Sequence, residues 1–480
     1  MSDHGTRRPG GERDRRGGSG PPRGGRPMVD PARQAAYETI AAVHRDDAYA
    51  NLALPRILRE LRLAGRDAAF ATELTYGTLR TAGTLDAIIA VAAGRDVSRI
   101  DPPARDALRL GAYQLLHMRV PAHAAVSSTV DLVRVVGGAS ATGFANAVLR
   151  RIGERPWDAW IAQVAPDRAG DPLGYLAVAY AHPPWITRAV SEALHGDVAQ
   201  TEALLAADNT PAPVHLCARP GLVDPAALAA EVGGEPGRYS PFAVYLPGGA
   251  PGDLAAIVDG RAHVQDEGSQ LVALALADAP LDGTDARWLD LCAGPGGKAA
   301  LLGALAAQRS AEVTALEIAP HRAELVHHAV RGLPVRVQCT DAREFDETGF
   351  DRVLVDAPCS GLGSLRRRPE SRWRRQPSDL PPLTRLQREL LTAAIRLVRP
   401  GGLVGYVTCS PHLVETQVTV TEAARRSPYP VELVDVRPAL PGGIPDLGTG
   451  PSVQLWPHRH GTDAMFLALL RRIGPAAPAR

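Results

Sequence analysis

Two cysteines stand in short polar turns, and each turn follows an apolar run of the sequence. Cys359 comes three residues after Asp356, which ends one run, and Cys409 directly follows Thr408 at the end of the next. Such runs, separated by helical patterns, predict strands of a parallel sheet whose carboxyl ends share one edge. A buried, inert thiol is the alternative for either cysteine alone. Two cysteines at neighbouring strand ends favour a site in which both thiols and the carboxylate of Asp356 converge.

Two thiols beside a carboxylate suit the 5-methylation of a pyrimidine. A thiolate that adds to carbon 6 turns carbon 5 into a nucleophile, so that one hard step becomes two easier ones. A free thiol has a pKa of about 8.5 and needs help to ionise. A carboxyl group such as that of Asp356 can hold ring nitrogen 3 and the exocyclic amine. A base must finally remove the proton from carbon 5 so that the thiol can leave.

A glycine-rich turn over residues 294–297 lies between an apolar run and a helical pattern, which predicts a strand, a loop and a helix. Glycine lets the backbone approach a ligand closely, and the following helix N-terminus favours an acidic group. Glu317 ends the next apolar run, where a carboxylate can accept hydrogen bonds from a ribose. Lys298 is the only lysine among 53 basic residues, which favours a specific role. A purely structural turn is the alternative.

The chain after residue 282 alternates strand and helix patterns, which predicts an α/β domain over residues 282–474 with a mostly parallel, Rossmann-like sheet of seven strands. Strands are expected at residues 287–292, 312–317, 334–339, 351–356, 402–408, 431–436 and 464–471. Helices are expected at residues 297–308, 319–331, 383–398 and 414–426.

The preceding 281 residues fall into four further parts. Residues 1–28 are rich in arginine and glycine and predict a disordered tail. Residues 29–153 predict an all-α domain, with helices at 32–44, 50–63, 66–81, 85–93, 103–116, 127–136 and 143–151. Residues 154–190 read as a connector, and residues 191–281 as a small α+β subdomain with strands near 214–218, 243–246 and 262–265.

Composition narrows the class of protein. The five cysteines form no CxxC pair, so neither a disulfide framework nor a metal site is expected. No apolar run reaches membrane-spanning length and no apolar signal core is present, so we expect a cytoplasmic protein without a membrane partner. The net charge of +1 neither indicates nor excludes a nucleic-acid partner.

The motifs around Lys298, Asp356 and Cys409 resemble those of the NOL1/NOP2/Sun RNA cytosine-5 methyltransferases, which use S-adenosylmethionine. The resemblance covers roughly residues 190–472. Residues 32–37, 73–77 and 143–152 resemble a NusB-like RNA-binding domain. Together the two parts resemble the Sun/Fmu type of bacterial 16S ribosomal RNA methyltransferase, which implies an RNA partner. We expect a monomer.

The resemblance also implies roles for individual residues. Cys409 would be the nucleophile, Cys359 would aid release of the product, and Lys298 would lie near Asp356. Glu317 would hold the ribose of the cofactor. The full set of candidate cofactor-binding residues is Cys292, Ala293, Gly294, Pro295, Gly296, Gly297, Lys298, Glu317, Arg322, Asp341 (beside the adenine) and Asp356.

Residues 365–375 carry six arginines around one tryptophan. Arginine suits phosphate groups and the indole ring can stack on a base, so this segment predicts an RNA contact. A solvated charged loop is the alternative. The residues proposed for RNA binding are Arg366, Arg367, Arg368, Arg372 and Trp373.

Other functions stay open at this point. A methyltransferase acting on an exocyclic amino group usually carries an Asp/Asn-Pro-Pro-aromatic turn, whereas this chain has Asp356–Ala357–Pro358–Cys359. A non-catalytic RNA-binding or antitermination factor is a second alternative, and a nicotinamide-dependent oxidoreductase is a distant third. Another RNA, such as transfer RNA, is a possible substrate.

Overall fold

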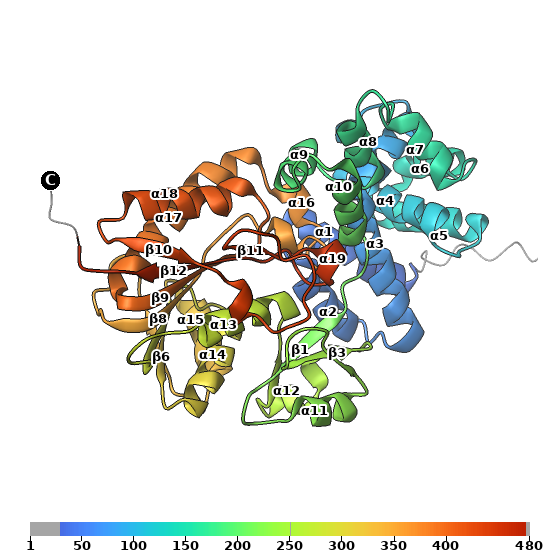
Figure 1. Ribbon diagram of the computed structural model, residues 1–480. Coiled ribbons are helices and arrows are strands. Elements are labelled where there is room, and N and C mark those ends of the chain that lie inside the picture. The colour runs from blue at the N-terminus through green and yellow to red at the C-terminus, as the bar shows by residue number, and fades with distance from the viewer. Residues whose placement is uncertain (1–28, 250, 477–480) are drawn as a thin grey trace, which may run out of the picture.

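The computed structural model describes residues 29–249 and 251–476, so the tail predicted over residues 1–28 lies outside the described residues. The chain runs from a helical domain through a layer of helices and a small sheet into a large α/β domain (Figure 1). Within the described stretches, no helix combines the length and apolar character that crossing a membrane requires.

The helical domain is built from six α-helices around a main apolar core that includes Ile40, Leu85 and Leu108, and a smaller apolar cluster lies between its first three helices. Asp30 caps the first helix by accepting a hydrogen bond from Arg33 N at 3.0 Å, as expected for an aspartate at a helix start. The helices are α1 Pro31–Arg45, α2 Ala50–Glu60, α3 Gly65–Ala93, α4 Pro102–His117, α5 Ala122–Val136 and α6 Thr142–Ile152.

The continuous helix α3 corrects the prediction of two helices over residues 66–81 and 85–93. Gly83 lies in its interior, where glycine costs about 1 kcal/mol relative to alanine and reads as a break. Because Gly83 has no side chain, another part of the chain can pack closely against the helix at this point. A β-carbon at Gly83 would lie 2.2 Å from Cη2 of Trp373, so only glycine lets the indole ring pack there.

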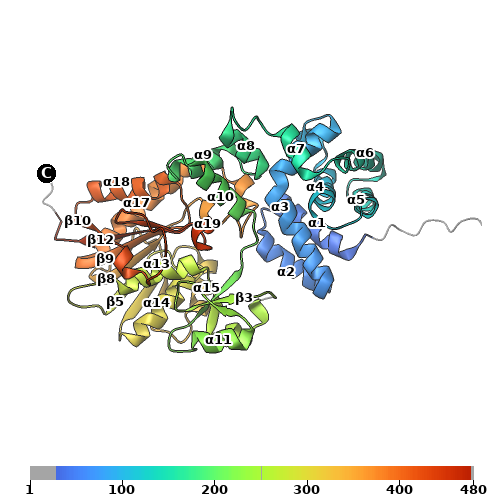
Figure 2. The ribbon, with the colours of Figure 1, turned by 45° about the vertical axis from the view of Figure 1, so that its right-hand side comes forward.

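The region predicted as a connector, residues 154–190, is largely helical and holds α7 Trp157–Val164, α8 Pro172–Ala179 and most of α9 Pro184–Ala193. Helix α10 Val198–Asp208 follows in the region predicted as the small subdomain. Ile186 and Val190 of α9 and Leu204 of α10 pack against Leu362 and Trp456 of the α/β domain. In Figure 2, α8, α9 and α10 accordingly lie between the helical domain and the large sheet.

The small subdomain is an antiparallel sheet in the order β2-β3-β1-β4. Its strands are β1 Val214–Ala218, β2 Glu235–Pro236, β3 Ala243–Leu246 and β4 Ala262–Val264, and its helices are α11 Pro225–Val232 and α12 Ala255–Val258. The strand β2 is too short for any pattern in the sequence to mark it. Leu216, Leu228 and Val244 form the core between the sheet and α11.

The large sheet has the order β10-β12-β9-β8-β5-β6-β7, which confirms the seven predicted strands, and a short eighth strand, β11, pairs with β12. Strands β5 to β9 are parallel to one another. Strand β12 runs antiparallel to β9, and β10 and β11 run antiparallel to β12. The strands are β5 Arg287–Asp290, β6 Glu312–Glu317, β7 Val335–Cys339, β8 Phe350–Asp356, β9 Val398–Thr408, β10 Val431–Val434, β11 Val453–Gln454 and β12 Phe466–Arg472.

Helices cover both faces of this sheet. Helices α13 Glu267–Asp278 and α14 Gly297–Gln308 pack on one face, and α17 Leu380–Leu397 and α18 Gln417–Arg426 pack on the other (Figure 1). Helix α15 Pro320–Ala329 follows β6 and packs against α14. Because β5 pairs with β6 on one side and with β8 on the other, the strand order reverses at β5. Ligands of such sheets bind outside the carboxyl ends of the strands at this switch point.

Candidate active site

The glycine turn follows β5 at the switch point and is held by the end of β6. Gly294 N donates to Glu317 Oε2 at 3.1 Å, and Arg322 donates to Gly294 O at 2.5 Å. Glu317 Oε1 also accepts from Ala319 N at 3.0 Å, and the residue is only 4% exposed. Gly296 has φ +111°, a backbone conformation that residues with a β-carbon rarely adopt. The turn is therefore a rigid cradle in which backbone groups lie at the surface of the site.

Lys298, in the first turn of α14, lies beside the end of β8. Its Nζ is 2.8 Å from Asp356 Oδ2, and its side chain is 10% exposed against 28% for Asp356. Burial alone favours a neutral amine, but the ion pair with Asp356 outweighs burial and raises the pKa of Lys298. The lone lysine is thus a protonated, nearly buried cation at the switch point.

The two candidate catalytic thiols meet in space although fifty residues separate them in sequence. Cys359 Sγ lies 3.4 Å from Cys409 Sγ, and both residues are half-buried. The hydrogen bond with Cys409, followed by burial, raises the pKa of Cys359 well above its ordinary value. Cys359 therefore keeps its proton at neutral pH and can donate a hydrogen bond to the sulfur of Cys409.

A buried glutamate holds the two cysteine turns together. Glu415 Oε1 accepts from Ser360 N at 2.8 Å and from Gln387 at 3.0 Å. Its Oε2 accepts from Ser410 Oγ at 2.7 Å and from Ser360 Oγ. Since Ser360 and Ser410 directly follow the cysteines, this carboxylate fixes the distance between the two thiols. Nothing in the sequence marks Glu415 for this position, and the sequence analysis missed it.

Asp290, the last residue of β5, was also missed. It is 0% exposed; its Oδ1 accepts from Cys292 N at 3.2 Å, while Oδ2 has no hydrogen-bond partner within residues 29–249 and 251–476. Burial, followed by the charge of Asp356, raises the pKa of Asp290 to about 7. An orphaned carboxyl oxygen directly behind the glycine turn fits a site that a polar ligand completes.

We expect the replacement Asp290→Asn to flatten the pH dependence of stability. Between pH 4 and 7 the folded wild type retains a proton that the unfolded chain has lost, so its free energy of unfolding falls as pH rises. The slope from one such group reaches about 1.4 kcal/mol per pH unit. Urea denaturation of both proteins across this range measures the difference. Parallel profiles for the two proteins would show that Asp290 titrates normally.

The remaining candidates lie around the same edge of the sheet. Cys292 is half-buried, and burial raises the pKa of its thiol well above the ordinary value, so the thiol keeps its proton at neutral pH. Asp341 follows β7 and accepts a hydrogen bond at 2.6 Å from Arg343, which lowers the pKa of Asp341. In the part of the chain that the structure describes, no His, Cys, Asp and Glu side chains gather as a metal ion requires.

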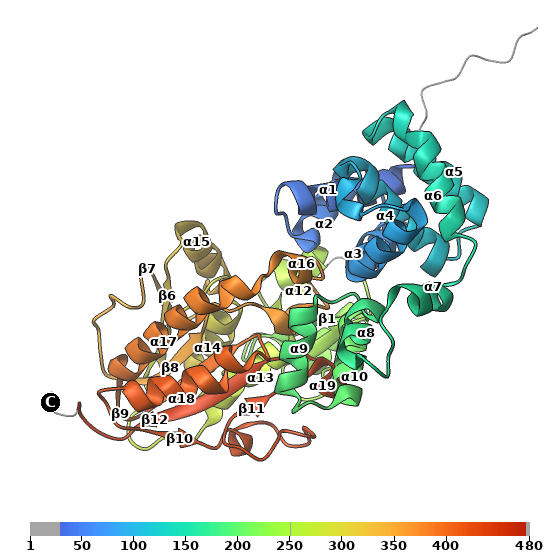
Figure 3. The same ribbon diagram turned by 90° about the horizontal axis from the view of Figure 1, so that it is seen from above.

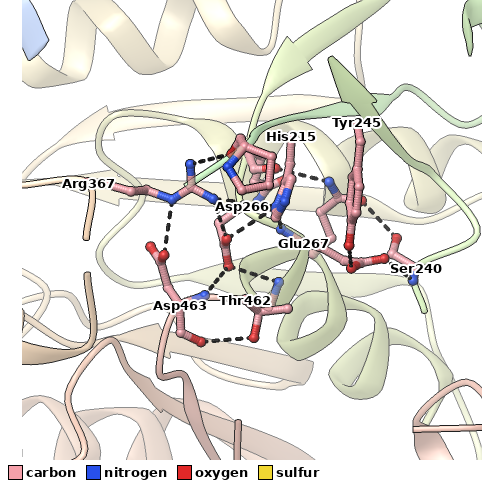
Figure 4. A network of polar contacts seen from close by, with 12 residues as sticks. His215, Ser240, Tyr245, Asp266, Glu267, Arg367, Thr462 and Asp463 are labelled. Atoms are coloured by element: carbon pink, nitrogen blue, oxygen red, sulfur yellow. Dashed lines mark hydrogen bonds and ion pairs between the residues drawn. The ribbon is translucent and has the colours of Figure 1, made fainter. Parts of the chain in front are cut away.

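The arginine-rich segment makes several contacts within the protein. Arg366 and Arg367 both donate to Asp463 and to Asp266, and the hydrogen bonds to Asp266 measure 3.3 and 2.7 Å. Figure 4 shows Arg367 in this polar network, together with His215 of β1 and with Asp266 at the start of α13. Arg367 also donates to Pro213 O at 2.9 Å. These guanidinium groups are therefore engaged within the protein, and an RNA contact of Arg366 and Arg367 stays a prediction.

Arg372, also proposed for RNA binding, is held inside the protein. It lies in α16 Ser371–Arg374 and is 0% exposed. Its guanidinium donates to Arg80 O at 2.9 Å, to Asp208 O at 2.8 Å and to Asn209 Oδ1 at 2.7 Å. Burial lowers the pKa of Arg372 to about 10, so the group stays charged. It joins the helical domain, α10 and the α/β domain, and Figure 3 shows α16 at their boundary.

Arg368 and Trp373 keep exposed surface. The guanidinium of Arg368 lies 5.0 Å from the ring of Tyr49, and Trp373 is 41% exposed although one edge of its indole packs on Gly83. For these two residues an RNA contact stays a prediction. The segment is thus mainly a tie between domains that also presents two side chains at the surface.

Comparison with known proteins agrees with this architecture. Residues 259–471 match the 16S rRNA methyltransferase RsmB/F family, and residues 30–154 match the NusB family. A Mycobacterium tuberculosis protein with a methyltransferase name is 58% identical over 446 residues, 93% of this chain and 97% of that protein. The ribosomal RNA small subunit methyltransferase B of Vibrio cholerae is 31% identical, covering 92% and 96%. The crystal structure of PH0851 shares the fold, with a TM-score of 0.76 and 24% identity over 93% of this chain and 99% of that one.

The fold and these matches together define an RNA methyltransferase with an N-terminal NusB-family domain. The chain belongs to the 16S rRNA methyltransferase RsmB/F family.

Proposed function

We propose that this protein transfers a methyl group from S-adenosylmethionine to carbon 5 of a cytosine in 16S ribosomal RNA. The observation that carries the proposal is the pair of thiols 3.4 Å apart, held by Glu415 at the sheet edge where Lys298 pairs with Asp356. Methylation of an amino group needs no thiol, so this arrangement favours the carbon-5 reaction over that alternative.

The residues of the switch point fit S-adenosylmethionine. The cradle at Gly294 and Gly296 leaves no room for side chains: a β-carbon at Gly294 would lie 2.2 Å from Glu317 Oε2. Behind it, the buried Oδ2 of Asp290 lacks a protein partner among the described residues. When bound, S-adenosylmethionine supplies an electrophilic methyl group. The glycine turn would hold its methionine end, Glu317 its ribose and Asp341 its adenine.

The two cysteines divide the chemistry between them. Cys409 Sγ, as the thiolate, forms a bond to carbon 6, and the electron pair of the 5,6 double bond shifts toward carbon 5. The carboxyl group of Asp356 accepts a hydrogen bond from the exocyclic amine and shares a proton with ring nitrogen 3, which neutralises the charge that the thiolate brings to the base. The ammonium of Lys298 pairs with the same carboxyl group. After carbon 5 has gained the methyl group, its proton must leave. The bond between carbon 6 and sulfur then breaks, and Cys409 is again a thiolate.

Cys359 is placed to accept that proton. Its pKa is raised chiefly by its hydrogen bond with Cys409. Once Cys409 is covalently bound to the base, its sulfur no longer needs the proton of Cys359, although burial still raises the pKa of Cys359. Cys359 would first release its own proton and then act as the base. The same pair of sulfurs thus serves the first and last steps of the reaction.

The test is a transfer assay with purified 16S ribosomal RNA from a strain that lacks this gene. We expect radioactive methyl groups from S-adenosylmethionine to appear in 5-methylcytidine after digestion to nucleosides. Bisulfite sequencing of the same RNA, with and without the protein, identifies the position. Label in an amino-methylated nucleoside, or in transfer RNA alone, would contradict the proposal.

We expect Glu317→Ala to weaken S-adenosylmethionine binding by about 10- to 100-fold, since hydrogen bonds to a charged group contribute about 1.5–3 kcal/mol. The loss has two sources, because the carboxylate would hold the ribose and also accepts the hydrogen bond from Gly294 N. Isothermal titration calorimetry measures it. Glu312→Ala, at the exposed start of the same strand, is the matched control. Equal affinity of both variants would move the ribose contact elsewhere.

A further inference from the structure

Gln265, which directly follows β4, has a side chain whose orientation is fixed by its neighbours. His263 Nε2 lies 3.0 Å from Gln265 Oε1 and 3.1 Å from the carbonyl oxygen of Gly297. The carbonyl oxygen of Gly297 can only accept, so the ring nitrogen must carry a proton and donate, and the atom of Gln265 that faces this proton must be the amide oxygen. Burial lowers the pKa of His263 to about 4, which leaves the ring neutral at physiological pH. The amide of Gln265 consequently turns its oxygen toward His263 and its nitrogen away.

The amide nitrogen of Gln265 has no partner in the described residues, although the residue is only 7% exposed. Leaving such a buried donor unpaired costs about 1–3 kcal/mol. A β-carbon placed on Gly297 would lie 3.6 Å from this nitrogen, so the amide reaches the first residue of α14. No side chain caps that helix among the described residues. Free amide hydrogens and a helix N-terminus thus converge on one point.

These donors select the charge of a ligand. A helix N-terminus carries a partial positive charge and attracts anions. The nitrogen of Gln265 offers two N–H groups and no lone pair, so it cannot accept from an ammonium group. The ligand group that satisfies both features is a small planar anion such as a carboxylate.

We propose that Gln265, oriented by His263, donates a hydrogen bond to the α-carboxylate of S-adenosylmethionine at the N-terminus of α14. This inference rests on the proposed function, because it assumes that S-adenosylmethionine occupies the glycine turn. It gives the small subdomain a part in the site. The strand β4 would deliver one contact to the methyl donor from outside the methyltransferase sheet.

Calorimetric titration with S-adenosylmethionine tests the contact without any RNA. Gln265→Met keeps the length of the side chain and removes both donors. We expect its affinity to fall about 10- to 100-fold, as for the loss of a hydrogen bond to a charged group. The matched control is Gln114→Met in the helical domain. Gln114 is also buried, at 1% exposed, but its amide is satisfied by Arg33 and Leu110 O, so its loss should leave the affinity unchanged.

A second ligand identifies the group that Gln265 contacts. Decarboxylated S-adenosylmethionine lacks only the α-carboxylate, so we expect the wild type to bind it about 10- to 100-fold more weakly than the parent compound. Gln265→Met should lose most of this preference. If the variant binds as the wild type does, or weakens both ligands equally, the inference is overturned.

Two further outcomes are distinguishable. A wild-type protein that binds neither ligand would contradict the proposed function itself rather than the role of Gln265. If Gln265→Met does not fold, Gln265→Asn retracts the amide by one methylene and supports the same comparison. Retention of the full preference for the carboxylate by Gln265→Asn would then count against the contact.

Discussion

Replacing Cys409 with alanine is expected to reduce methyl transfer by roughly 10⁴-fold or more, the scale of loss when a covalent nucleophile is removed. Without sulfur at this position, carbon 5 of the cytosine cannot become a nucleophile. The folded structure should survive, because Cys409 is half-buried and its turn is held through Ser410 and Glu415. Single-turnover assays with radioactive S-adenosylmethionine measure the loss.

The affinity of Cys409→Ala for S-adenosylmethionine should equal that of the wild type, since the thiol is not among the proposed ligands. Cys339→Ala is a suitable control, because Cys339 is an exposed thiol far from Cys409 in the strand order. It should leave turnover unchanged. If Cys409→Ala turned over as fast as the wild type, this sulfur could not be the nucleophile, and the carbon-5 mechanism would lose its basis.

Replacing Cys359 with alanine is expected to block the last step of the reaction, in which the methylated base is released from Cys409. Cys409 can still add to the base and carbon 5 can still be methylated. The nearest base for the proton is then missing, which costs about 10²- to 10⁴-fold. The protein–RNA adduct should accumulate as a slowly migrating band on a denaturing gel, containing both protein and labelled RNA.

The double variant Cys359→Ala/Cys409→Ala distinguishes a covalent adduct from tight binding. It should yield no slow band, because it lacks the sulfur that bonds to carbon 6. Cys359→Ala with normal turnover and no band would show that the release step uses another group. A band that persists in the double variant would place the covalent bond on a different residue.

The sequence predicts the strands of the large sheet and the site at its edge because both follow local rules. Apolar runs mark the buried strands, and the carboxyl ends of parallel strands meet wherever the fold closes. Asp356, Cys359 and Cys409 needed only this rule to be placed together. The pairing of Lys298 with Asp356 at 2.8 Å followed from the family resemblance, not from spacing.

Long-range contacts explain what the sequence did not predict. Glycine weakens a helix, so the sequence predicts a break near Gly83, yet α3 continues through this residue. The glycine leaves space for the indole of Trp373, which lies 290 residues later in the sequence. The cluster of arginines predicts a surface for RNA, yet Arg372 is fully buried and donates to carbonyl oxygens of Arg80 and Asp208, which lie far away in the sequence. Glu415 has no signature, because its role exists only once Ser360 and Ser410 are adjacent.

The buried guanidinium of Arg372 limits how this polypeptide can be divided. A fragment that starts after the helical domain would lack Arg80, and Arg372 would lose the hydrogen bond to its carbonyl oxygen. A fragment that ends before residue 360 would lack Trp373, and Gly83 would then have no indole ring packed against it. Arg372 and Trp373 thus tie the NusB-family part to the α/β domain through contacts that neither part can make alone.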